Sequence, residues 1–432
     1  MITTRYVREH IDEINESMKK RHSDYPVAEL LDLDEKSRKI STELQELRAK
    51  RNTGSLEVAQ AKKQNKVVDD SKVAELSQIK KGIEEKEEEL LKYQGRIDYL
   101  LMNMPNVLHD SVPYGKDSGE NTEIKKWGTP RRKTSQNHVD ILKKLNLLDL
   151  ETAAKVSGAR FYYLKGDLAL LEQALIRFAI DVMISKGYTL ISPPFMLKKK
   201  YYEGATALGD FEEALYKVSE PKEAQGAQNL EKIEDELFLI STSEHPMAAL
   251  VAENVFSTRD LPIKYVGISP CFRREAGAHG KDTKGIFRVH QFYKVEQFVV
   301  TGQEESWDMF EEMIKNSEDI FQKLGLHYRI VNICTGDIGI VAAKKYDLEV
   351  YMPSSGEYRE MVSCSNCTDW QSLRLDIKYD EKGKRTYAHT LNSTVSAIER
   401  LMVAIVENYS NDDGTITVPD ALVPYMGKNR IG

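Results

Sequence analysis

Cysteine is scarce in this sequence, with four residues among 432. Cys364 and Cys367 have the C-x-x-C spacing, but no second such pair and no H-x-x-x-H run accompanies them. Since a structural zinc site needs four ligands, we expect no structural zinc and interpret the pair as part of the fold. A chain this poor in cysteine also gives no sign of a disulfide framework, and we expect a reduced, cytoplasmic protein.

Long apolar runs and an excess of basic residues are missing too. No segment reaches the ~18 apolar residues of a membrane helix, and the first residues, MITTRYVREH, contain no apolar signal core. We therefore expect no membrane partner. The formal net charge is −7, so binding of a nucleic acid would require a local basic patch. The length is sufficient for two or three domains.

The sequence also lacks a Walker A phosphate loop. Gly280 and Lys281 are followed by Asp282, whereas that loop has serine or threonine after its lysine. A P-loop nucleotide site is therefore excluded.

Proline is absent between Val27 and Met104, as long uninterrupted helices require. Apolar residues in this segment follow a 3-4 spacing from Leu30 to Leu47 and again, after a polar break, from Leu76 to Leu100. The pattern predicts an antiparallel helical hairpin with helices of about 40 Å each. From Arg48 to Lys81, nine Lys or Arg residues face four Asp or Glu residues. This charge fits a solvated, salt-bridged coiled coil, or alternatively a basic tip that contacts a phosphate backbone.

The most informative stretch runs from Cys271 to Val300. It has the form of two strands joined by a loop, 276–285, whose three glycines let the backbone bend closely around a ligand. Alternation predicts that Arg273 and Glu275 share a face of the first strand. On the second strand it groups Arg288, His290, Phe292, Lys294 and Glu296. Such a surface could bind a nucleotide through cations and an aromatic ring; a solvated outer face of an antiparallel sheet is the alternative.

This stretch resembles motif 2 of the class II aminoacyl-tRNA synthetases, in the form found in seryl-tRNA synthetases. The matching residues are Phe272, Arg273, Glu275, Ala276, Gly277, Gly285, Arg288, Val289, His290, Gln291, Phe292, Lys294, Val295 and Glu296. Three further segments agree with the resemblance: 187–194 is similar to motif 1 and ends at Pro194, 389–409 is similar to motif 3, and 242–244 is similar to the serine-binding T-x-E. The resemblance covers the chain from about Leu30 to Gly427.

The resemblance implies an α+β fold, in which a class II antiparallel sheet flanked by helices follows an N-terminal antiparallel helical hairpin. It implies a tRNA-binding domain with a coiled-coil arm at 1–110, a linker at 111–130 and a catalytic domain at 131–432. Motif 1 implies a homodimer. The implied activity is the ATP- and Mg²⁺-dependent ligation of L-serine to its tRNA through a seryl-adenylate, with selenocysteine tRNA as a second candidate substrate.

The resemblance also assigns roles to individual residues. The implied catalytic residues are Arg273, Glu275, Arg288 and Arg400. The implied ATP ligands are Arg273, Arg274, Glu275, Val289, Phe292, Glu360, Met361, Val362, Ser363 and Arg400, of which Glu360 and Ser363 would also hold Mg²⁺. The implied L-serine ligands are Thr242, Ser243, Glu244, Arg273, Glu296, Asn392 and Thr394. We expect Glu296→Gln to impair serine activation far more than folding.

The chain departs from the family in the segment 392–395, which reads Asn-Ser-Thr-Val where many members have Asn-Gly-Ser-Gly. The glycines are lost while a hydroxyl remains, so Thr394 and Ser396 are both candidates for contacting serine. We expect the strand in this region to end near Asn392, and we expect the charged segment 217–236 to be a surface insertion.

Two other functions remain open. A paralogue that aminoacylates carrier proteins resembles the catalytic domain but lacks the long arm, which this chain has. A catalytically inactive RNA-binding or scaffolding protein could also have kept the fold, although Arg273, Glu275, Glu360 and Arg400 are intact. Binding of ATP would discriminate between the inactive protein and an enzyme.

Overall fold

The computed structural model describes residues 3–64, 69–134, 136–206, 214–219, 236–275 and 284–432. Most of the predicted loop 276–285 and most of the predicted insertion 217–236 lie outside these residues. The chain divides into two compact units. The smaller contains Ile2–Lys19 and Ser23–Pro105, and the larger contains Lys20–His22 and Asn106–Gly432.

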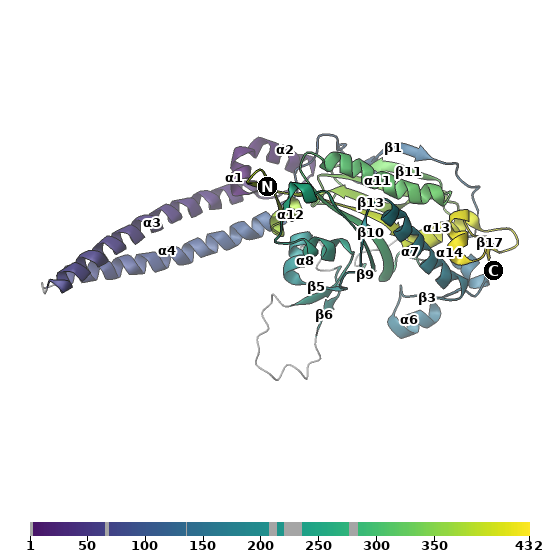
Figure 1. Cartoon of the computed structure of the whole chain (residues 1–432), viewed down its shortest axis with the longest axis horizontal. Coiled ribbons are helices and arrows are strands. Elements are labelled where there is room, and N and C mark those ends of the chain that lie inside the picture. Colours follow the sequence, from purple (N-terminus) through teal and green to yellow (C-terminus); the bar gives the residue numbers. More distant parts are fainter. Residues whose placement is uncertain (1–2, 65–68, 135, 207–213, 220–235, 276–283) are drawn as a thin grey trace. The chain divides into compact units, whose positions relative to one another are not determined.

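The smaller unit consists of helices, and two of them form the predicted hairpin (Figure 1). Its helices are α1 (Thr4–Glu9), α2 (Ile11–Lys20), α3 (Val27–Lys63) and α4 (Asp70–Asn103). The 37 residues of α3 correspond to about 55 Å, which is longer than predicted because the helix continues through the polar residues after Asn52. Ile40, Leu44 and Ile83 are buried between α3 and α4.

Ion pairs join the two helices of the hairpin. Arg48 contacts Glu87 and Arg96 contacts Glu29, each at 2.7 Å. These pairs are exposed, so each contributes about 1 kcal/mol or less. The salt-bridged coiled coil is therefore present, and it coexists with exposed basic side chains near the tip, among them Lys50, Lys62 and Lys63.

The larger unit is built on an eight-stranded sheet (Figure 1). Its strands in spatial order are β1 (Thr122–Trp127), β11 (Tyr328–Asn332), β12 (Lys344–Met352), β13 (Glu357–Asn366), β16 (His389–Ala397), β10 (Gln291–Thr301), β9 (Ile263–Phe272) and β4 (Thr189–Ile191). Neighbours are antiparallel except for β4 and β9, which are parallel. The predicted antiparallel sheet is confirmed, and its edge strand β1 comes from the segment 111–130.

Helices and short strands surround the sheet. The remaining helices are α5 (His138–Lys144), α6 (Glu151–Ser157), α7 (Asp167–Ser185), α8 (Lys199–Ala205), α10 (Glu244–Leu250), α11 (Ser306–Lys323), α12 (Trp370–Arg374), α13 (Ile398–Tyr409) and α14 (Val423–Met426). The remaining strands are β2 (Leu148–Asp149), β3 (Tyr163–Leu164), β5 (Met196–Lys198), β6 (Lys217–Val218), β7 (Leu237–Leu239), β8 (Val255–Ser257), β14 (Lys378–Glu381), β15 (Lys384–Tyr387), β17 (Ile416–Thr417) and β18 (Arg430–Ile431).

The two faces of the sheet have different surroundings. On one face, α7, α11 and α13 cover the core, because each helix presents an apolar stripe such as Leu168, Leu171 and Leu175 of α7. Side chains alternate along β10, so that Val295 is fully buried in this core. Its neighbours Lys294 and Glu296 face the other way and line a cavity. This agrees with the alternation predicted for the second half of motif 2.

The first half of motif 2 is not as predicted. β9 ends at Phe272, so Arg273 and Glu275 do not share a strand face. Glu275 has a φ of 48°, a left-handed conformation that turns the chain. His290 precedes β10, and its Nδ1 lies 2.9 Å from the carbonyl oxygen of Arg273 instead of facing the cavity.

The prediction that a strand ends near Asn392 is also wrong. β16 continues to Ala397, five residues further. Thr394 and Val395 are β-branched and favour an extended backbone, whereas the glycines found here in many relatives would not. The strand is held from α11, where the hydroxyl of Ser317 donates to the carbonyl oxygen of Thr394 at 2.8 Å.

Candidate active site

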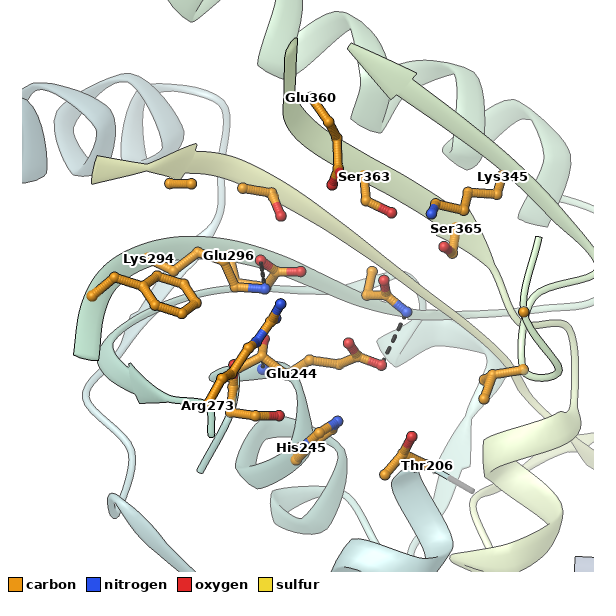
Figure 2. A pocket seen from close by; sticks show the side chains of 18 of the residues that line it. Thr206, Glu244, His245, Arg273, Lys294, Glu296, Lys345, Glu360, Ser363 and Ser365 are labelled. Atoms are coloured by element: carbon orange, nitrogen blue, oxygen red, sulfur yellow. Dashed lines mark hydrogen bonds and ion pairs between the residues drawn. The ribbon is translucent and has the colours of Figure 1, made fainter. Parts of the chain in front are cut away.

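A cavity of about 370 Å³ lies on the face of the sheet opposite α11 (Figure 2). Side chains from β10, β12, β13 and β16 meet there, together with residues after β9, residues before β12 and residues at the start of α10 and α13. The predicted site residues that line it are Thr242, Glu244, Arg273, Glu275, Arg288, Val289, Phe292, Glu296, Glu360, Met361, Ser363, Asn392, Thr394 and Arg400. Residues far apart in the sequence are thus brought together as predicted.

Three predicted residues are not part of this lining. Ser243 is fully buried and its hydroxyl lies 3.4 Å from the carbonyl oxygen of Gly267. Val362 is fully buried in the core beneath the helices. Arg274 is exposed, and its backbone N–H donates to Ala214. The structure therefore supports no side-chain contact of these three residues with a molecule in the cavity.

One end of the cavity combines arginines with aromatic rings. The guanidinium of Arg273 lies 5.2 Å from the centre of the Phe292 ring, and that of Arg400 lies 5.1 Å from the centre of the Phe287 ring. Arg400 stands at the third position of α13 and donates to the carbonyl oxygen of Glu360 at 3.0 Å. Arginines stacked on rings beside a cavity are suited to bind phosphates and a nucleobase.

Carboxylates accompany these arginines. Glu275 accepts a hydrogen bond from Nε of Arg288. Glu360 lies 3.7 Å from Arg400. Burial raises the pKa of Glu360, but the charges of Arg400 and Lys345 outweigh burial, so that the pKa is lowered and the group is ionised at neutral pH.

At the other end, Glu244 is held by two amides. The side-chain N–H groups of Gln371 and Asn392 donate to its Oε1 at 2.8 and 3.0 Å. Burial, and then the nearby Glu296, raise the pKa of Glu244 to about 7. The hydroxyl of Thr242 accepts from the backbone N–H of Glu244 at 3.2 Å, so this threonine also has a turn-forming role.

Glu296 is fully buried between Glu244 and β16. Its carboxylate pairs with Lys294 at 2.7 Å (Figure 2), while burial raises its pKa. A bulge between Val295 and Glu296 places Thr394 opposite Glu296. Of the two candidate hydroxyls, Thr394 lines the cavity, whereas the hydroxyl of Ser396 is buried without a partner among the described residues.

Several lining residues were not predicted. They include His245, Lys345, Ser365, Cys367, Glu399 and the segment 338–342. Burial, and then Lys294 and Arg273, lower the pKa of His245 to about 3, so its imidazole is neutral. Cys367 belongs to the C-x-x-C pair, and its Sγ accepts from Nδ2 of Asn392 at 3.3 Å. For Cys367 and Glu399, the only signal in the sequence that they line the cavity was their position close to motif residues.

Within the described residues, no three His, Cys, Asp or Glu side chains form a group that could hold a metal ion alone. None of the described helices has both the length and the apolar character needed to cross a membrane.

Comparison with known proteins identifies both parts of the chain. Residues 1–108 match the model of the seryl-tRNA synthetase N-terminal domain. Residues 216–409 match the model of the tRNA synthetase class II core domain (G, H, P, S and T).

Individual relatives match over the whole length. A serine–tRNA ligase from Methanoculleus marisnigri is 47% identical over 99% of both chains. The crystal structure of seryl-tRNA synthetase from Pyrococcus horikoshii complexed with ATP is 43% identical, has a TM-score of 0.91, and covers 100% of this chain and 99% of its own. The cytoplasmic serine–tRNA ligase of Naegleria fowleri in complex with AMP is 39% identical, with a TM-score of 0.84 over 97% and 95% of the two chains. These matches along the sequence show that the chain belongs to the seryl-tRNA synthetase family of class II enzymes.

Proposed function

We propose that the protein is a serine–tRNA ligase that activates L-serine with ATP as a seryl-adenylate and transfers the seryl group to tRNA. The observation that carries this proposal is the distribution of charge in the cavity. Four ion pairs neutralise most of the charged lining residues: Arg288 with Glu275, Lys294 with Glu296, Lys345 with Asp347, and Arg400 with Glu360. Burial raises the pKa of Glu399 to about 8, so this carboxyl is largely neutral at pH 7.

Among the charged residues that line the cavity, Arg273 and Glu244 are left without an ion pair in the described part of the chain. Among the described residues, Nε of Arg273 donates to the carbonyl oxygen of Ser241 at 3.3 Å, and Glu244 accepts only from neutral amides. One cation and one carboxylate without ionic partners are the complement of a zwitterionic amino acid. The carboxylate of serine would pair with Arg273 and its ammonium group with Glu244.

The first step needs orientation and charge stabilisation more than covalent help. An oxygen of the serine carboxylate attacks the α-phosphorus of ATP, and the bond to the bridging oxygen of pyrophosphate breaks. Arg273 is placed to hold both the serine carboxylate and the α-phosphate, while Arg288 and Arg400 can bind the leaving phosphates. Phe292 offers a ring for the adenine, and Glu275 is the predicted contact of its edge.

Mg²⁺ fits the residues at the ATP end. Glu360 is an ionised carboxylate, and the hydroxyl of Ser363 faces the same cavity (Figure 2). Mg²⁺ prefers such oxygen ligands and usually completes its shell with water and phosphate. Glu360 and Ser363 would hold the ion, which supplies positive charge to the phosphates when bound.

In the second step a ribose hydroxyl at the 3′ end of tRNA attacks the carbonyl carbon of the adenylate, and AMP leaves. We propose that residues 1–110 bind the tRNA through the hairpin, with 111–130 as linker and 131–432 as catalytic domain. The exposed lysines near the tip and the N-terminal domain match support this assignment. Selenocysteine tRNA is a second candidate substrate, to be tested by charging purified transcripts of each tRNA.

A homodimer is part of the proposal. The edge strand β4 and its surroundings expose large apolar side chains, namely Leu170, Ile184, Leu190, Phe195 and Met196. A second copy of the chain would cover them, and light scattering of the purified protein tests this. We also propose a cytoplasmic location, which the four free thiols support.

ATP–pyrophosphate exchange with each of the twenty amino acids tests the proposal without tRNA. We expect exchange with serine alone. Exchange with a different amino acid would refute the assignment of the pocket. No exchange, together with no ATP binding by calorimetry, would leave the inactive RNA-binding protein, and serylation of a carrier protein in preference to tRNA would leave the paralogue.

A further inference from the structure

One wall of the cavity is an irregular segment whose carbonyl groups accept hydrogen bonds from residues far away in the sequence. Residues 338–342 line the cavity consecutively, and 338–343 belong to no helix or strand in this described part of the chain. Backbone carbonyls in such a segment need hydrogen-bond donors from elsewhere. Ile340 and Val341, both half-buried, give this wall an apolar surface.

Five consecutive carbonyls at this wall accept hydrogen bonds from three residues. Arg21 donates to the carbonyl oxygens of Gly339 and Ala342. Asn106 donates to those of Ile340 and Val341. His109 donates to that of Ala343, the residue directly after the wall. The bonds from Asn106 measure 2.7 Å to Ile340 and 2.9 Å to Val341, and that from Arg21 to Ala342 measures 2.8 Å. Arg21 also donates to the carbonyl oxygen of Asn106 at 2.9 Å, so the two residues hold each other.

Asn106 reaches the proposed serine ligands through a short chain of contacts. Its side-chain amide, buried to 3% exposure, also donates to the carbonyl oxygen of Cys367 at 2.8 Å. The Sγ of Cys367 accepts from Asn392 at 3.3 Å, and Asn392 donates to Glu244 at 3.0 Å. The residue that fixes the wall therefore also fixes the backbone beside the amide that orients Glu244.

Strand register places this wall away from the ATP end. Lys345, which follows the wall, pairs with Ser365 of β13, and Ser365 pairs with Asn392 of β16. Glu360 lies five positions earlier on β13, roughly 16 Å away along the strand. Displacement of the wall should therefore affect the serine end before the ATP end.

We propose that Arg21 and Asn106 are positioning residues for the serine end of the cavity, acting through the segment 338–342 and Cys367. Neither residue lines the cavity, so neither contacts a molecule bound in it. This inference rests on the proposed function, because it requires that serine binds at Glu244.

The test measures KM for serine and KM for ATP in pyrophosphate exchange for two variants. Asn106→Ala removes the side-chain donations to Val341 and Cys367 while the backbone bond to Ile340 is kept, and Arg21→Lys keeps the charge but replaces the planar fork. Loss of such buried hydrogen bonds is expected to raise KM for serine about tenfold, while KM for ATP stays within about twofold of wild type. Asn254→Ala, whose exposed amide donates to the carbonyl oxygen of Ala252, and Arg430→Lys, whose exposed guanidinium pairs with Asp413, are the matched controls and should change neither constant.

A rise in KM for serine without a rise in KM for ATP distinguishes a role in positioning the serine end from a general structural role. Equal increases in both constants, a lower kcat with both constants unchanged, or wild-type values in folded variants would each overturn the inference. If Asn106→Ala does not fold, as judged by thermal melting, Arg21→Lys decides the matter by the same split. Absence of serine-dependent exchange in the wild type would instead refute the proposed function and this inference with it.

Discussion

The ionisation of Glu244 should control serine binding in the physiological pH range. Burial and the neighbouring Glu296 raise its pKa to about 7, while Lys294, Gln371 and Arg273 oppose the shift. Only the ionised carboxylate pairs with an ammonium group. Between pH 8 and pH 6 the ionised fraction of a group with this pKa falls about tenfold. We therefore expect kcat/KM for serine to fall about tenfold over this interval.

Pyrophosphate exchange at limiting serine and saturating ATP measures this profile directly. Glu244→Gln should lower kcat/KM at pH 8 and flatten the profile, because the amide does not titrate. Glu312→Gln is the control and should keep the wild-type profile, because Glu312 is a partly exposed residue of α11 that pairs only with Lys264 in the described part of the chain. The same decline in Glu244→Gln would show that another group titrates, and a flat wild-type profile would refute the raised pKa.

Three further changes test other parts of the cavity. Glu296→Gln should lower serine activation about 100-fold. Contrary to the expectation from the sequence, it should also lower the free energy of unfolding by about 3 kcal/mol, because Lys294 is left buried without its counter-charge. Lys294→Met combined with Glu296→Gln should recover the melting temperature and not the activity. Glu399→Gln should be more stable than wild type at pH 9 and not at pH 5. Because the pKa of Glu399 is raised from 4.5 to about 8 in the folded protein, this carboxyl lowers the stability of the wild type as the pH rises between those values. Melting curves at both pH values check this. Gly285→Ala should cost about 2 kcal/mol and raise KM for ATP, since Gly285 has a φ of 74° and an added Cβ would lie 2.0 Å from Nε2 of His138.

Regular secondary structure explains which parts of the site could be predicted. Phe292, Lys294 and Glu296 lie on a long strand, where alternation of side chains is dictated by backbone geometry, and all three line the cavity as expected. Arg400 also lines the cavity, from the first turn of a strongly apolar helix. The cavity did not follow from the pattern alone but was implied by the resemblance to a family, and the partners of these residues came only with the structure.

The errors occur where the backbone leaves regular geometry. Glu275 adopts a left-handed conformation without being glycine, and no local signal marks such a residue. The wall 338–342 could not be predicted at all, because its hydrogen bonds come from Arg21 and Asn106, more than 200 positions earlier in the sequence. The continued strand after Asn392 could have been predicted, because the glycines that would interrupt it are replaced by Ser393 and Val395, and Thr394 and Val395 are β-branched.

The ion pairs of the cavity imply different requirements for its two substrates. Serine can bind Arg273 and Glu244 without breaking an ion pair among the described residues. The phosphates of ATP must instead draw Arg288 from Glu275 and Arg400 from Glu360, which lie within 4 Å of each other in each pair. Glu275, whose side chain is 10% exposed, then needs a new partner, because a buried charge without one is costly, whereas the side chain of Glu360 is 45% exposed and reaches solvent. The edge of adenine offers donors to Glu275. A phosphate chain without adenine would leave Glu275 uncompensated, so selectivity for a nucleotide over a bare phosphate chain follows from the pairing itself.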